Sequence, residues 1–362
     1  MNKINEYNPQ IVLHPSETLK EKLEELGIGP KEFALRTDKP EKTITAILNG
    51  SSSITPDMAV QFENVLGIPA HFWLNKQRTY DEYLAREKRK KVVKQALSWA
   101  SKFPVNDMCK KNWIQNVKNS EEKAISLLYF FGFSNHKAWE SYYYNKELKV
   151  AFRISLAHVN EPFAISAWLR KGELQASEMK ASAFTEKKLK ECLKDLKNIM
   201  IHQDSNFFSN VQSICLNAGV KVVHTPCLPK APINGAARWI NDTPLIQLSN
   251  RYKRNDIFWF TLFHEIGHIL LHGKKDIFLE EIEYPNLDTK KEDEANEFAG
   301  NLVLTDEQYN EALNLKRFSV AAIVALAEKF NTHPAIIIGR LQKEKRLKQS
   351  FGNRLYEYVN LP

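Results

Sequence analysis

The first quarter of the chain alternates short apolar faces with turn residues, and this pattern predicts four short helices. In the first of them Leu19, Leu23 and Leu26 recur at helical spacing, and Gly27 ends the segment. A longer and highly charged helix is expected to follow from about Trp73. The four short helices are predicted over residues 14–26, 30–36, 40–48 and 56–66.

The second and third of these helices are separated by the turn Asp38-Lys39-Pro40, with small or apolar residues where the two helices cross. Two short helices joined by a tight turn are the arrangement of a helix-turn-helix. The spacing fits an all-helical bundle without a DNA function equally well. Both interpretations stay open on the spacing alone.

From about residue 205 the pattern changes to short strands mixed with helices. Two apolar runs separated by the turn Asn241-Asp242 predict a β-hairpin. An apolar helix follows the hairpin and ends at Gly273. The elements predicted here are a helix over 207–218, strands over 220–223, 235–240 and 245–248, and helices over 258–270, 292–304 and 320–330.

The whole pattern predicts a mostly helical α+β protein. We expect an all-α helix-turn-helix domain over 1–85 and a mostly helical linker over 86–204. A domain with a small sheet is expected over 205–310, and a helical cap over 311–362. The linker has the least regular pattern, with one strand expected over 149–154.

The composition is that of a packed protein, since 43% of the 362 residues are apolar and 26% are charged. No apolar run approaches the roughly 20 residues that a membrane helix needs. The polar segment MNKINEYNPQ lacks the apolar region of a secretory signal. The four cysteines form no CxxC pair and indicate reduced thiols. We therefore expect a cytoplasmic protein without a membrane partner.

The positive charge is unevenly distributed. The net charge is +8, yet residues 1–85 hold nine Lys and Arg against twelve Asp and Glu. The basic excess begins at 86–91 and recurs at 343–348. Non-specific DNA affinity scales with the number of neutralised phosphates, so DNA binding by the N-terminal domain would depend on dimerisation and on the stretch at 86–91. A solvated helix face is the alternative for that stretch.

The strongest chemical signal is His264-Glu265-Ile266-Gly267-His268, an HExxH motif inside the apolar helix. Two histidines four residues apart project from one helix face, so both imidazoles can reach a single Zn²⁺. Glu265 then stands beside the open coordination position, where it can take a proton from water and pass it to a leaving amine. The motif is short, and two hydrogen-bonded core histidines are the alternative.

A catalytic zinc also needs a third protein ligand and an open fourth position. The predicted helix at 292–304 begins with EDEANEFA, and we predict Glu292 as the third ligand. Asn296, one turn later, is expected to fix the tautomer of a histidine ligand. Glu294 points about 200° away around the helix. A solvated acidic run at a helix start is the alternative.

Two further features lie close to this motif. His272 continues the histidine spacing by one more turn. A fourth protein ligand would close the site, so we interpret His272 as a residue near the cleft that supports the site without binding zinc. A surface histidine that satisfies the last helix carbonyls is the alternative. Gly235 to Arg238 is a candidate edge strand for an extended peptide.

Two stretches carry a family resemblance, WFTLFHEIGHILLH at 259–272 and EDEANEFA at 292–299. With them, the segment 220–298 resembles the ImmA/IrrE family of metallopeptidases. The resemblance implies a gluzincin-like fold for the zinc peptidase domain and a link to repressor cleavage. It also implies Glu265 as the catalytic acid and base, and as zinc ligands His264, His268 and Glu292. Where many relatives continue with Leu-Met-Pro, this chain has LVLT at 302–305.

The segment 14–75 resembles the HigA-type antitoxin branch of Xre-like helix-turn-helix proteins, over 19–26, 31–36, 43–50 and 54–66. The resemblance favours the DNA-binding interpretation and implies a recognition helix over about 40–48. The side chains that it implies in contact with base edges or phosphates are Arg36, Lys39, Lys42, Thr43 and Thr45.

Together the two resemblances imply a transcriptional regulator that carries a Zn²⁺-dependent endopeptidase, latent or activated by a signal. The expected partners are operator DNA at its own promoter, a protein substrate such as a repressor, or a toxin, and a second copy in a homodimer. The alternative is a non-proteolytic, antitoxin-like repressor whose peptidase-like domain is a sensor or a toxin-binding module.

Overall fold

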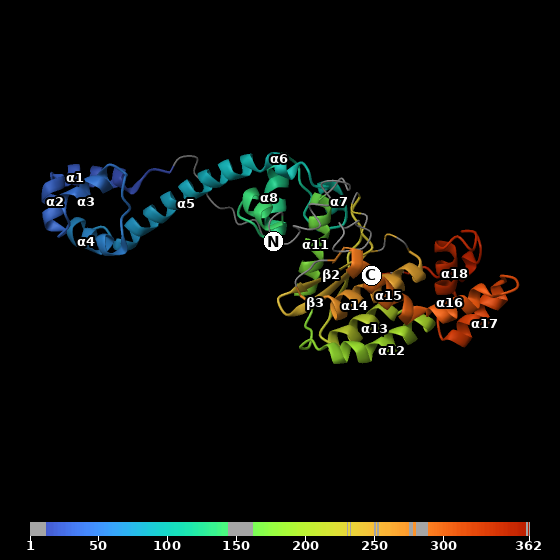
Figure 1. Ribbon diagram of the computed structural model, residues 1–362. Helices are drawn as coiled ribbons and strands as arrows, with labels where there is room; N and C mark the ends of the chain where they lie inside the picture. Colours follow the sequence, from blue (N-terminus) through green and yellow to red (C-terminus); the bar gives the residue numbers. More distant parts are fainter. Residues whose placement is uncertain are drawn as a thin grey trace. The chain divides into compact units, whose positions relative to one another are not determined.

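The protein is mostly helical with one small sheet, which confirms the predicted α+β class (Figure 1). The computed structural model describes residues 12–143, 162–229, 231, 233–249, 251, 253–274, 278–279, 289–359 and 361. The chain divides into two compact units, Met1–Gln95 and Ala96–Pro362. The division into four domains stays a prediction, and the strand expected over 149–154 lies outside the described residues.

The first unit is, over its described residues, a bundle of five helices, and the first four are those that the sequence predicts. The His14 ring accepts a hydrogen bond from the Ser16 N–H, and Gly27 ends the first helix in the left-handed region at φ 65°. The helices are α1 (Pro15–Leu26), α2 (Pro30–Arg36), α3 (Glu41–Leu48), α4 (Pro56–Leu66) and α5 (Ala70–Gln95).

Three buried aromatic rings fill the centre of this unit. The Phe62 ring lies 4.9 Å from the Phe33 ring and 6.0 Å from the Trp73 ring, measured between centroids. All three side chains are fully buried and pack against aliphatic residues of α1, α3 and α4. Helix α5 continues well past this core and carries the basic stretch at 86–91 on its exposed surface.

The second unit begins with helices that gather around an aromatic cluster. Trp99, Phe103, Phe131 and Trp139 contact one another, and the Trp139 ring stacks on Phe163 at 5.4 Å between centroids. The helices are α6 (Leu97–Ala100), α7 (Val105–Lys110), α8 (Ser120–Phe131), α9 (His136–Tyr142) and α11 (Pro162–Ser177).

A four-stranded sheet follows, with the strand order β1-β3-β2-β4. The predicted hairpin is confirmed, since β2 and β3 pair antiparallel across a turn in which Asn241 adopts φ 54°. The other neighbours are β1, parallel to β3, and β4, antiparallel to β2. The strands are β1 (Lys221–His224), β2 (Gly235–Ile240), β3 (Thr243–Leu248) and β4 (Phe278–Leu279).

The prediction of an edge strand at 235–238 is wrong. Ala236 and Ala237 pair with β4, so β2 is an inner strand over those residues. The physical reason is that a strand of two residues gives no detectable alternation in the sequence, so β4 could not be predicted.

Helices cover both faces of the sheet. On one face α11 packs against Val223 and Leu245 through Ala176, and on the other α13 and α14 pack against Val222 and Ile246. The remaining helices extend that second core without a break to the end of the chain. They are α12 (Glu186–His202), α13 (Phe207–Asn217), α14 (Asn255–Leu271), α15 (Thr289–Val303), α16 (Asp306–Leu313), α17 (Val320–Phe330) and α18 (Pro334–Lys343), with a short 3-10 turn, η2, at Asn353–Leu355.

The helix with the HExxH motif, α14, is buried over most of its length because it lies between the sheet and α15. A helix that is apolar on all sides is expected in such a place. Across the described ranges, no helix combines the length and the apolar character that crossing a membrane requires.

Candidate functional site

The two motif histidines meet on the buried face of α14. Their Nε2 atoms lie 2.9 Å apart, and each side chain is only 1–2% exposed. The i, i+4 spacing on one helix produces this arrangement, because residues one turn apart stand above one another. The structure therefore brings His264 and His268 together as the spacing predicts.

Helix α15 brings a carboxylate to the same point. One carboxylate oxygen of Glu292 lies 3.2 Å from His264 Nε2, and the other lies 3.4 Å from His268 Nε2. The two helices can approach because Gly267 has no side chain. A Cβ there would stand 3.1 Å from the Phe298 ring and 3.4 Å from the Ala295 Cα. The glycine inside the HExxH motif thus leaves room for this close approach of the two helices.

The three side chains fit a zinc ion. Each offers one ligand atom, and these atoms lie within 4.8 Å of one another. A tetrahedral zinc with bonds of about 2.0–2.1 Å holds its ligand atoms about 3.3 Å apart. The closest approaches between the three side chains, 2.9, 3.2 and 3.4 Å, fall around that value. Two imidazoles and one carboxylate are also the ligand set of a catalytic zinc with an open fourth position.

The charge states of these groups suit a cation. Burial on its own would raise the pKa of Glu292, but the hydrogen bonds from His264 and His268 lower this pKa to about 2. Burial lowers the pKa of His268 to about 4, against the opposite effect of Glu292. Near neutral pH the carboxylate is therefore ionised and the imidazole is neutral, which are the forms that bind a metal.

Glu265 is fully buried and lies against the second strand of the sheet. A Cβ added to Gly235 would stand 2.6 Å from Glu265 Oε1 and 2.6 Å from the Thr261 methyl group. Only a glycine at the start of β2 therefore leaves room for this carboxylate. Gly235 is part of the strand predicted for peptide pairing, and its close approach to Glu265 was not predicted from the sequence.

The polar contacts beside His268 differ from those predicted. His272 Nδ1 lies 3.0 Å from His268 Nδ1, and His272 Nε2 lies 3.0 Å from Glu294 Oε2. Asn296 is exposed, and among the described residues no hydrogen bond joins it to a histidine. Ala295 is buried against α14, and Asn296, the next residue, is rotated by about 100° around the helix toward solvent. The prediction that Asn296 fixes a histidine tautomer is therefore wrong.

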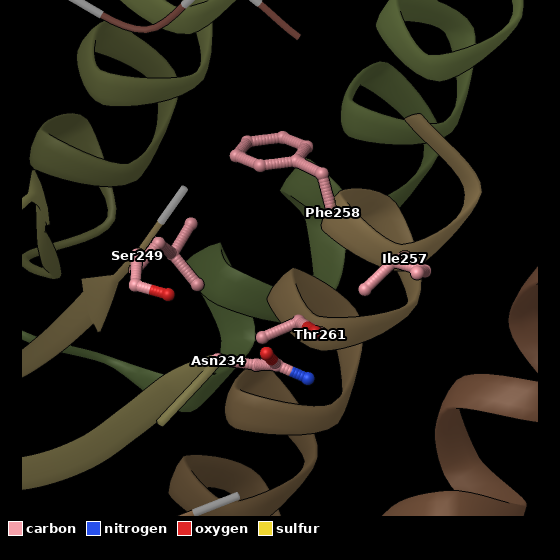
Figure 2. A pocket seen from close by; sticks show the side chains of 6 residues that line it. Asn234, Ser249, Ile257, Phe258 and Thr261 are labelled. Atoms are coloured by element: carbon pink, nitrogen blue, oxygen red, sulfur yellow. The ribbon is translucent and has the colours of Figure 1, made fainter. Parts of the chain in front are cut away.

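A small cavity lies one helical turn before Glu265 (Figure 2). Figure 2 shows Asn234 and Thr261 on its wall, and the Thr261 hydroxyl has no hydrogen-bond partner within the part of the chain that the structure describes. Its volume of about 10 Å³ accommodates at most one water molecule. The cavity is therefore too small to hold a substrate side chain.

The residues predicted to contact DNA lie on and around α3. Lys42 and Thr45 are exposed there, and Thr43 is half-buried. The two other predicted cations hold ion pairs within the unit, Arg36 with Glu32 and Lys39 with Asp57. The Asp57 partner of Lys39 was not predicted from the sequence, because the two residues are 18 positions apart along the chain and only the fold of the unit brings them together.

Comparisons with known proteins match one family model in each of the two units. Residues 19–73 match the family model described as helix-turn-helix. Residues 215–342 match the model of a peptidase family described as the IrrE N-terminal-like domain. The second match contains His264, His268 and Glu292 together with the sheet.

Relatives of the N-terminal unit include an uncharacterized HTH-type transcriptional regulator, YddM, of Escherichia coli strain K12. It is 32% identical over 66 residues, which are 18% of this chain and 70% of that protein. Among solved structures, the chain is similar to a HigA-family addiction module antidote protein from Coxiella burnetii. The two sequences are 36% identical, the match covers 23% of this chain and 92% of that chain, and the TM-score is 0.22. The chain is also similar to the structure of the Pseudomonas aeruginosa antitoxin HigA with the higBA promoter. The two sequences are 29% identical, the match covers 22% of this chain and 89% of that chain, and the TM-score is 0.22.

Proposed function

Because the chain belongs to the Xre-like helix-turn-helix family and carries an IrrE-like domain of a peptidase family, we propose that it is a cytoplasmic DNA-binding regulator with a zinc-dependent endopeptidase. The observation that carries the enzymatic half is the convergence of His264, His268 and Glu292, with the Glu265 carboxylate on the same helix. We propose a repressor or another regulatory protein as the substrate.

In this proposal His264, His268 and Glu292 hold the zinc ion. Bound zinc supplies Lewis acidity, which activates water as a nucleophile at neutral pH. The Glu265 carboxylate accepts a proton from the attacking water and later donates it to the nitrogen of the leaving amine. The buried position of Glu265 strengthens its electrostatic interactions, since the surrounding dielectric constant is low.

The first test is the zinc content of the purified full chain. We expect about one zinc per chain in the wild type and in Glu265→Gln, because the glutamine leaves all three ligands in place. His268→Ala removes a ligand and should lose the metal. A wild-type chain that binds no zinc after reconstitution would overturn the enzymatic half and favour a sensor or a toxin-binding module.

The second test looks for the substrate directly. Cells that express the wild type or Glu265→Gln are compared for new protein N-termini, under conditions that induce the chain. We expect at least one regulatory protein to be cleaved only with the wild type, since a general base typically contributes about 100- to 10,000-fold in rate. Equal cleavage with both chains would remove Glu265 from the proposed role.

The DNA-binding half rests on α3, where Lys42 and Thr45 are exposed. We propose that the chain binds an operator in its own promoter as a homodimer, with α3 in the major groove. The test is a mobility shift with the upstream region at low salt, against a scrambled sequence of equal length. Thr45→Ala and Lys42→Ala should weaken the shift. Equal affinity for the two DNAs would contradict operator recognition.

A further inference from the structure

A row of three side chains leads from the candidate metal centre to the protein surface. His268 Nε2 faces His264 and Glu292, while His268 Nδ1 lies 3.0 Å from His272 Nδ1. His272 Nε2 then lies 3.0 Å from Glu294 Oε2. The His272 side chain is 3% exposed and the Glu294 side chain is 43% exposed, so the row ends at solvent. The rings of His268 and His272 are 5.1 Å apart between centroids.

The protons in this row are fixed by elementary hydrogen-bond accounting. A neutral imidazole has one N–H donor and one acceptor nitrogen. If His268 gives the lone pair of Nε2 to a metal, its proton must stand on Nδ1. It then donates to His272 Nδ1, which must be the acceptor. His272 in turn carries its proton on Nε2 and donates it to the Glu294 carboxylate.

The opposite direction of the row does not permit metal binding. If His272 donated from Nδ1, His268 would accept at Nδ1 and carry its proton on Nε2, the atom that faces His264 and Glu292. For a neutral His272, Glu294 excludes this direction, because an ionised carboxylate can only accept and therefore holds the single His272 proton on Nε2. The same accounting explains why His272 continues the histidine spacing without being a ligand, since both of its nitrogens are already engaged.

We infer that His272 and Glu294 are positioning residues that fix His268 in its metal-binding tautomer and ring orientation. This inference rests on the proposed zinc site. Partners of this kind typically contribute about 10- to 100-fold to metal affinity. Lys290 lies 3.6 Å from the other Glu294 oxygen, which helps to hold the carboxylate in place at the surface.

The experiment measures zinc affinity by chelator competition in the full chain. His272→Ala removes both contacts and should weaken zinc binding about 10- to 100-fold without changing the stoichiometry. His272→Asn keeps an acceptor atom close to the place of Nδ1 and should recover part of the loss. Glu294→Ala is expected to have a smaller effect than His272→Ala. The matched control is Glu297→Ala, which removes an exposed carboxylate from the same helix.

A second measurement separates positioning from a general loss of structure. The ¹⁵N chemical shifts of His268 in the zinc-loaded and metal-free chains report which nitrogen carries the proton. In the metal-free chain the Glu292 carboxylate favours a proton on Nε2 of His268, and the His272–Glu294 pair favours a proton on Nδ1. We therefore expect a larger fraction of the Nδ1–H tautomer in the metal-free wild type than in metal-free His272→Ala. Helix content by circular dichroism should stay equal in the two chains.

The outcomes distinguish this inference from the proposed function. A wild type without zinc contradicts the proposed function. A wild type with zinc and a His272→Ala chain of equal affinity contradicts only the positioning role. Loss of the whole zinc equivalent in His272→Ala, with the fold intact, would make His272 a ligand and would also overturn the inference.

Discussion

The two units place their candidate functional side chains in opposite environments. In the first unit Lys42 and Thr45 stand in solvent on α3. In the second unit His264 and His268 are almost fully buried and converge with Glu292 on one point. The packing of the second unit alone brings the three candidate metal ligands together. The candidate DNA-contacting side chains of α3, in contrast, are exposed to solvent.

The charged groups differ in the same way. Arg36 and Lys39 pair with acids at the surface, where an ion pair contributes about 0–1 kcal/mol to stability. Glu292 is an ionised carboxylate that is partly buried between two histidines, so removing one of them takes a hydrogen-bond partner from a partly buried charge, which is more costly. Substitutions of the charged side chains should therefore have small effects in the first unit and large effects at the candidate metal site of the second unit.

The largest effect is expected from Phe62→Ala, which tests whether the two units are separable. Phe62 is fully buried between two other aromatic rings, and such truncations cost about 3–5 kcal/mol. The core of the first unit is small, so this loss should unfold that unit and abolish operator binding. Zinc content and the thermal transition of the second unit should stay unchanged, as measured by elemental analysis and calorimetry.

The matched control for this prediction is Phe72→Ala. Phe72 is only half-buried in the same unit, so its truncation should lower the first transition by less. If Phe62→Ala also removed the zinc or shifted both transitions equally, the two units would unfold as one and the comparison would fail.

The next effect concerns the approach of β2 to Glu265. Gly235→Ala places a methyl group 2.6 Å from the Glu265 carboxylate and should cost about 1–3 kcal/mol, as overpacked cores do. We expect cleavage to fall while the zinc stays bound, because no ligand is moved. The control is Gly300→Ala in α15, where the added methyl group meets open space and should stabilise the chain by about 0.5–1 kcal/mol. Urea unfolding of the second unit measures both, and equal signs would contradict the close approach.

The same contrast explains how much the sequence could predict. The short helices of the first unit and the helix α14 follow from periodicity and end signals, because each of them repeats over several turns. The triad His264, His268 and Glu292 was also placed correctly together, since ligand chemistry restricts which residues can serve. Features that follow from hydrophobic periodicity and from metal-ligand chemistry can therefore be predicted from one sequence.

Contacts that depend on the mutual rotation of two helices could not be predicted. The helical wheel of α15 placed Asn296 near the histidines and Glu294 away from them. In the structure His272 reaches from the end of α14 to Glu294, because the glycine at 267 lets the helices pass closely. The ion pair of Lys39 with Asp57 could not be predicted either, because it depends on how the helices of the first unit are arranged.

A smaller effect is expected at that ion pair. Asp57→Asn releases Lys39, which is then available to a DNA phosphate, at a cost to stability below about 1 kcal/mol. The plot of log affinity for the operator against log salt should steepen by about one unit, since each neutralised phosphate contributes about 0.9. Glu21→Gln is the control, because it makes the same charge change on the exposed face of α1. An equal change in both variants would reduce the effect to net charge.

The smallest effect concerns one histidine in each unit that caps a helix. Nδ1 of His14 accepts from the Ser16 N–H at the start of α1, and Nδ1 of His333 accepts from the Ala335 N–H at the start of α18. Burial lowers the pKa of both rings below the ordinary value of 6.5. At His14 the carboxylates of Asp81 and Glu17 oppose this shift and Lys20 adds to it. At His333 the carboxylates of Glu357 and Asp256 oppose it.

The unfolded chain therefore binds protons at these histidines more readily than the folded chain does. The stabilising contribution is fully present above about pH 6.5 and is lost as the pH falls below that value. His14→Asn and His333→Asn keep a capping acceptor and remove the titration, so each should flatten the pH dependence of its own unit between pH 7.5 and 5.5. The change should be larger for His333, which is 7% exposed, than for the half-buried His14. Calorimetry of the two transitions measures this, and a flat profile in the wild type would contradict it.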